Sequence, residues 1–194
     1  GGSRLDGDDV TQVDLESLTK IVANSSAITD MAGLEYAVNL KSLQLNNNSL
    51  STIDVSANIK LKNLQLNNNS LSAIDVSANT ALRTLNLYNN SLKTLDVSTN
   101  TLLKNLNLSN NDLTTLDVSI NTSLQKLQVN NNDLTTINLS TNTSLSDLRL
   151  ENNHLSTIIG LENWVTTNGK LFVRYNHLQT ALDGGLKATL DAID

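Results

Sequence analysis

Apolar residues return at a fixed spacing along most of this chain of 194 residues. Each return opens the same frame of apolar and polar positions, L-x-x-L-x-[LV]-x-x-N-x-L. A constant period of roughly 20–30 residues predicts a solenoid, because each coil can bury its apolar face only against the coils beside it. The leucines that open the frame lie 21 residues apart (61 − 40 for the first pair), at Leu40, Leu61, Leu82, Leu103, Leu124 and Leu145.

Alternation inside the frame predicts a short strand in the first half of each coil. In Leu43-Gln44-Leu45 the two leucines point inward and the glutamine outward, because side chains alternate across a strand. The second half alternates again, so we expect Ile53 and Val55 to face the core. A coil of this length has no room for a helix of several turns, and we expect an extended or 3₁₀ segment there. The predicted fold is a right-handed solenoid with a parallel sheet on its concave face.

An asparagine recurs at the ninth position of the frame. Leaving its amide buried and unpaired costs several kcal/mol (roughly 2–7), so each amide must bond to backbone groups. We therefore predict a structural ladder in which every amide bonds to its own coil and to the adjacent coil. Its members are Asn48, Asn69, Asn90, Asn111, Asn132, Asn153 and Asn176.

The two ends of the chain depart from the repeat, as the ends of a solenoid do. Residues 1–17 are expected to hold an expression-tag remnant at Gly1-Gly2-Ser3 and a cap with a capping box at Thr11 to Asp14. Residues 18–178 are expected to form about eight coils, with a longer coil at each end. Residues 179–194 are expected to form a C-terminal cap or to begin a following segment, and their apolar spacing at 185–193 favours a helix.

The frame is the signature of leucine-rich repeats. The chain resembles the internalin-like surface proteins of bacteria with short repeats, through the phrase L-[DN]-V-S-x-N-T that begins at Leu95 and Leu116. Its segment from Ile28 to Tyr36 is similar to the phrase that opens internalin-like arrays. The resemblance covers roughly residues 10 to 178. It implies a secreted, extracellular or cell-surface location and a role in adhesion or recognition, without naming a ligand.

Composition narrows the range of partners. A net charge of −6 and a pI near 4.8 argue against nucleic acid or an anionic membrane as the partner. The chain has no cysteine, which excludes a disulfide-clamped cap, and no apolar run approaches the roughly 18 residues that span a bilayer. We expect a monomer without a cofactor that binds a protein or a glycan and does not insert into membranes.

The outward positions of the strands carry the candidate binding residues. In the N-terminal half they are mostly uncharged amides such as Gln44 and Gln65, which suit a glycan or an extended peptide but equally serve as soluble filler. The C-terminal end differs, because arginine and exposed aromatic residues are enriched at binding hot spots. The predicted ligand-binding residues of the concave face are Arg149, Glu151, Phe172, Arg174 and Tyr175, with Tyr88 as a separate aromatic residue in mid-face.

Two other columns have metal-ligand chemistry, and neither predicts a metal site. Calcium needs six to eight oxygen ligands, so local bonds to backbone N–H groups account better for the outer carboxylates Asp54, Asp75, Asp96 and Asp117. His154 and His177 continue a column from Asp112 and Asp133, but two imidazoles do not make a zinc site, and we interpret them as surface residues.

The function predicted from the sequence is recognition of a protein or glycan on the concave face. An enzyme is not expected, because an open sheet with parallel polar rows lacks a dry pocket of converging groups. The alternative is a passive spacer within a larger surface protein. Ice binding and calcium-dependent adhesion are less favoured, because the outward rows are rich in amides and variable.

Overall fold

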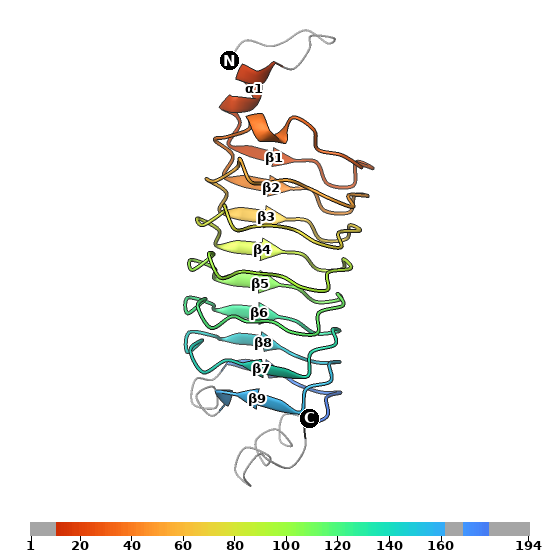
Figure 1. The fold of residues 1–194 in the computed structure, drawn as a ribbon, viewed down its shortest axis with the longest axis vertical. Coiled ribbons are helices and arrows are strands. Elements are labelled where there is room, and N and C mark those ends of the chain that lie inside the picture. Colours follow the sequence, from red (N-terminus) through yellow and green to blue (C-terminus); the bar gives the residue numbers. More distant parts are fainter. Residues whose placement is uncertain (1–10, 162–168, 179–194) are drawn as a thin grey trace.

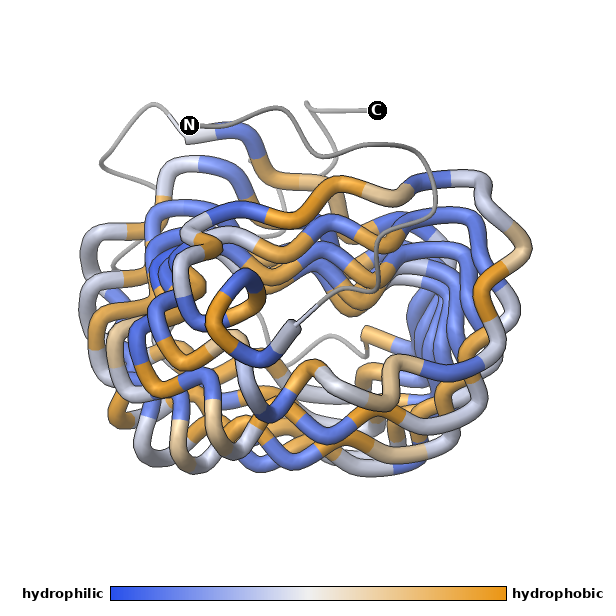
Figure 2. The backbone as a smooth tube through the Cα atoms, turned by 90° about the horizontal axis from the view of Figure 1, so that it is seen from above, coloured by the Kyte–Doolittle hydropathy of each residue, from blue (hydrophilic) through white to orange (hydrophobic). Residues whose placement is uncertain are grey.

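The computed structural model describes residues 11–161 and 169–178. It shows an elongated stack of coils in which the strands of successive coils lie one above another (Figure 1). Seen down the stack, the coils superimpose and each closes an oval loop around the interior (Figure 2). The predicted solenoid is confirmed.

The main sheet has eight parallel strands within the described residues, in the order β1-β2-β3-β4-β5-β6-β8-β10. Neighbouring strands pair at the same frame position, for example Leu43 with Leu64. Pairing of Lys20 with Ser42 and of Lys170 with Asp147 confirms the longer first and last coils. The strands are β1 (Lys20–Val22), β2 (Ser42–Gln44), β3 (Asn63–Gln65), β4 (Thr84–Asn86), β5 (Asn105–Asn107), β6 (Lys126–Gln128), β8 (Asp147–Arg149) and β10 (Lys170–Phe172).

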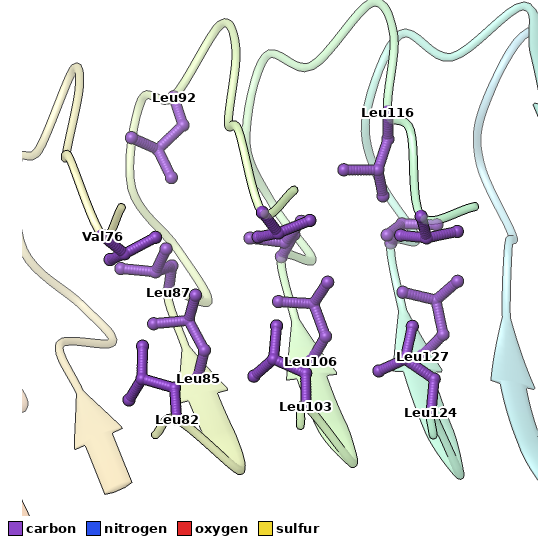
Figure 3. Packing of buried hydrophobic residues seen from close by; sticks show 14 of the residues in the cluster. Val76, Leu82, Leu85, Leu87, Leu92, Leu103, Leu106, Leu116, Leu124 and Leu127 are labelled. Carbon is purple, nitrogen blue, oxygen red and sulfur yellow. The ribbon is translucent and has the colours of Figure 1, made fainter. Parts of the chain in front are cut away.

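Columns of leucine form the core. Leu43 and Leu45 are fully buried, as the alternation predicts, and the residue between them faces outward. Burying a leucine contributes about 1.5–3 kcal/mol, so these columns supply the hydrophobic driving force that scarce aromatic residues do not. Equivalent leucines stack from coil to coil (Figure 3), with Leu82, Leu103 and Leu124 in one row and Leu85, Leu106 and Leu127 in the next.

The second half of each coil is extended, which confirms the expectation for the outer wall. Two of these segments also pair in parallel as β7 (Thr136–Asn138) and β9 (Thr157–Ile159). This pairing was not predicted. It occurs where Asn138 and Ile159 take the frame position of the stacked aspartates, so no like charges face each other across the strands.

A short helix, α1 (Gln12–Ser17), begins with the predicted capping box between Thr11 and Asp14. Its Glu16 carbonyl accepts a bond of 2.8 Å from the Asn39 side chain, which ties the helix to the first coil. A 3₁₀ turn, η1 (Leu34–Tyr36), follows in that coil. The helix expected at 185–193 lies outside the described residues.

The predicted asparagine ladder is present, and each of its seven members donates to the backbone of the preceding coil. The Nδ2 of Asn90 donates to the carbonyl of Leu87 in its own coil at 3.0 Å and to that of Leu66 in the preceding coil at 3.1 Å. Its Oδ1 accepts the N–H of Leu71 at 3.0 Å. Because one amide satisfies three backbone groups of two coils, the ladder bonds neighbouring turns to each other.

A second asparagine ladder, which the sequence analysis missed, lies in the outer half of the coils. The Nδ2 of Asn100 donates to the carbonyls of Val76 and Asn79 in the preceding coil, both at 3.0 Å. The Oδ1 atoms of this ladder are buried and have no hydrogen-bond partner among the described residues. The 21-residue spacing was visible in the sequence, but the turn serines beside it made these residues look like turn asparagines. The members are Asn58, Asn79, Asn100, Asn121 and Asn142.

Replacing Asn90 by Ala is expected to destabilise the protein by about 1–3 kcal/mol, because it leaves the N–H of Leu71 without its partner and removes one of the two amide donors from the carbonyls of Leu66 and Leu87. The matched control is Asn89→Gly, because Asn89 is exposed and has φ 55°, a conformation that glycine keeps without strain. Urea melts measure both variants. Equal losses of stability would contradict the assignment of the ladder amide as the bonded one.

Candidate binding surfaces

The sheet face of the N-terminal coils is covered by amides that bond to one another. Asn46 donates to the Gln65 side chain at 3.3 Å, and Gln65 donates to Asn63 at 3.2 Å. Part of the donor and acceptor capacity of this face is therefore used within the protein. The amide rows provide a polar, solvated surface, and β1 adds the exposed side chains of Lys20 and Val22 at its N-terminal edge.

The C-terminal coils carry a charged and aromatic cluster on the same face, which we call the sheet-face patch (Lys126, Asp147, Arg149, Glu151, Phe172 and Arg174). Asp147 lies 3.0 Å from the Lys126 ammonium and 3.7 Å from Nε of Arg149. The Arg149 guanidinium carbon lies 5.0 Å from the ring centroid of Phe172, within the range of a cation–π contact. The patch thus holds a planar cation over an aromatic ring that remains 39% exposed.

The structure brings most of the predicted binding residues together and separates two of them. Arg149 and Phe172 end the paired strands β8 and β10, and Glu151 and Arg174 follow two residues later. Tyr88 lies in the coil of β4 and is half-buried. Tyr175 lies at the turn beyond β10 rather than on the sheet face.

The position of Tyr175 follows from a backbone feature of every turn. The residue before each ladder asparagine has a positive φ, which ends the alternation of the strand. A left-handed residue other than glycine or asparagine is strained by roughly 1–2 kcal/mol. Tyr175 has φ 58°, whereas six earlier coils place asparagine there, with φ of 53–57°, at Asn47, Asn68, Asn89, Asn110, Asn131 and Asn152.

The turns of the last four coils enclose a shallow groove of about 570 Å³, which we call the turn-edge groove. The imidazole Nε2 of His154 lies 3.4 Å from Oδ1 of Asp133, and its ring centroid lies 5.3 Å from that of His177. The histidine column was visible in the sequence, but its closeness to Tyr175 was not. Among the lining residues are Asn131, Asp133, Asn152, His154, Tyr175 and His177.

The outer aspartates bond locally, as expected. Oδ1 of Asp96 accepts the backbone N–H of Ser98 at 2.8 Å, and the equivalent aspartates do the same in their coils. The backbone and side-chain hydrogen bonds from Ser98 hold the pKa of Asp96 below its ordinary value, although burial and the charges of Asp75 and Asp117 oppose this. Within residues 11–161 and 169–178, no group of three or more histidine, cysteine or acidic residues is arranged to hold a metal ion.

The lowered pKa of Asp96 predicts how stability depends on pH. The folded state binds this proton more weakly than the unfolded chain, so the contribution is present above the unfolded pKa and disappears as pH falls through the folded pKa. NMR titration of the Asp96 carboxyl is expected to give a pKa below 3.8. Ser98→Ala is the control, because it keeps the backbone donor and should leave the pKa partly lowered. A pKa at or above 3.8 would contradict the bonded geometry.

Comparison with known proteins agrees with this architecture. A Leucine Rich Repeat profile matches residues 39–57. Internalin C2 from Listeria monocytogenes has a TM-score of 0.67 at 21% identity, over 86% of this chain and 84% of that one. The internalin InlF of the same species has a TM-score of 0.61 at 26% identity, over 88% of this chain and 64% of that one.

A third structure, the functional domain of InlJ from Listeria monocytogenes, is described as including a cysteine ladder. It has a TM-score of 0.48 at 29% identity, over 75% of this chain and 42% of that one. This chain therefore spans less than two thirds of the InlJ and InlF chains. A comparison with curated proteins finds no match. No helix in the described residues is long and apolar enough to cross a membrane. The repeat frame, the parallel stack and the likenesses to internalin C2 and InlF together show a leucine-rich repeat fold like that of the internalins.

Proposed function

We propose that the protein is a binding module that recognises a protein or glycan partner through the C-terminal part of its sheet face. The observation that carries this proposal is the sheet-face patch, in which Arg149 lies over Phe172 while Asp147 lies beside its Nε. Planar groups that are already positioned lose little conformational entropy when a partner docks. A large aromatic ring exposed on a largely polar sheet also favours a binding role.

The proposed contact residues are Arg149, Glu151, Phe172 and Arg174, with Tyr175 at the adjacent turn and Tyr88 as a separate contact. One carboxylate oxygen of Glu151 is buried and has no hydrogen-bond partner among the described residues, so a donor from a partner would satisfy it. The open, parallel arrangement of these groups suits binding and offers no enclosed site for catalysis. The resemblance to internalins supports a secreted or cell-surface location and an adhesive role for the parent protein.

A passive spacer is the second candidate, and the amide rows favour it. Side chains that bond to one another, as Asn46 and Gln65 do, need no ligand to be satisfied. Screening the purified protein on protein and glycan arrays distinguishes the two functions, because a spacer retains no partner above background.

For a partner found on such an array, Arg149→Ala and Arg174→Ala are each expected to weaken binding by about 1–3 kcal/mol, because they remove planar cations from the centre of the patch. Gln44→Ala is the matched control on the same face and should be near neutral. Calorimetric titration measures all three variants, whose side chains point away from the core. Loss of binding in the Gln44 variant alone would place the site on the N-terminal amide rows.

A further inference from the structure

The side chains of the turn-edge groove differ from those at the turns of the N-terminal coils, although the backbone of every turn makes the same hydrogen bond. The residue after each ladder asparagine donates its backbone N–H to the preceding coil at 2.9 Å, whether it is Ser91, Asp133 or His177. The side chain at this position is therefore not needed for the turn. Along the stack it changes from serine to charged or imidazole groups, in the order Ser49, Ser70, Ser91, Asp112, Asp133, His154 and His177.

The residue before the ladder asparagine also changes, from asparagine to Tyr175 in the last described coil. In most of the earlier coils the left-handed asparagine also bonds to its counterpart, as Asn152 does to Asn131 at 2.7 Å. Tyr175 occupies the same left-handed conformation without an amide to continue this column, and its side chain is 76% exposed. Neither backbone preference nor burial explains a tyrosine there. Strained residues that the fold does not require are typical of functional sites.

The chemistry of the groove selects a class of ligand. It has one exposed aromatic ring, carboxylates at Asp112 and Asp133, imidazoles at His154 and His177, and side-chain amides. An aromatic face packs against the C–H face of a sugar ring, while carboxylates and amides bond to its hydroxyl groups. The two carboxylates disfavour anionic sugars. A peptide would need apolar pockets for its anchors, and Tyr175 is the one large hydrophobic side chain that lines the groove.

We propose that the turn-edge groove is a binding site for neutral glycans, separate from the sheet-face patch. Tyr175 provides the stacking surface. Asp133 accepts hydroxyl hydrogen bonds and lies within 3.4 Å of His154, so the pair is already placed before a sugar arrives. Asn131 and Asn152 offer further polar contacts along the edge, at the spacing of successive coils.

The test uses calorimetric titration of the whole chain with cellopentaose, maltopentaose, mannopentaose and chitopentaose, and with sialyllactose as an anionic comparison. At least one neutral oligosaccharide is expected to bind, and sialyllactose is not. Tyr175→Asn should weaken that binding by about tenfold or more. This variant restores the residue that six other coils use, so its urea midpoint should equal or exceed that of the parent. Asp133→Ser, which restores the residue of the N-terminal coils, should weaken binding similarly.

Gln44→Ala is the matched control, because Gln44 lies on β2 outside both proposed sites and should leave sugar binding within about twofold. The sheet-face proposal is tested with other variants and another partner, so its failure would not affect this result. The turn-edge proposal is overturned if no neutral oligosaccharide binds, or if binding survives Tyr175→Asn and is lost in Arg149→Ala. It is also overturned if binding requires a divalent cation and is independent of Tyr175.

Discussion

The structure depends on the pairing of buried asparagine amides with the backbone of neighbouring coils. A solenoid coil cannot close its own hydrogen bonds at the turns, and a buried backbone group without a partner costs about 1–3 kcal/mol. The amide of Asn90 accepts the N–H of Leu71 and shares the carbonyls of Leu66 and Leu87 with the ladder amides of the adjacent coils. The second ladder donates to two carbonyls per coil on the outer side. Leucine burial drives the coils together, and the two ladders set the distance and register at which they stack.

The same turn explains why the binding surfaces lie where they do. Each ladder asparagine follows a left-handed residue, which directs one side chain to the edge of the stack instead of the sheet face. Asparagine tolerates this conformation, so the edge is an amide column until Tyr175 interrupts it. The sheet face and the turn edge are therefore two distinct surfaces. On both, the C-terminal coils carry other side chains than the N-terminal coils do. Arg149 and Phe172 mark the first surface, and His154 and Tyr175 mark the second.

The repeat made the fold and the first ladder predictable, because a fixed period allows one physical solution for every coil. The second ladder was missed because Asn100 lies two residues after Ser98, in a phrase that resembles a simple turn. Tyr175 was expected on the sheet face together with its sequence neighbour Arg174, but its left-handed backbone ends the strand and directs its side chain to the edge. The turn-edge groove could not be predicted, because it depends on the left-handed backbone that places Tyr175 beside His177 at the turn. The pairing of β7 and β9 depends on where the stacked aspartates end, a balance of weak charge effects that the frame does not specify.

Native-state hydrogen exchange at the backbone N–H groups of Leu92 and Leu113 tests the central claim most directly. These two groups donate to the ladder oxygens of Asn111 and Asn132, both at 3.0 Å, in the middle of the stack. If the ladder holds the coils together, both amides exchange only when the stack unfolds, with the opening free energy and denaturant dependence of the strand amides beside them. Rapid exchange with little dependence on denaturant would show that the ladder bonds open locally, and that leucine packing alone maintains the stack.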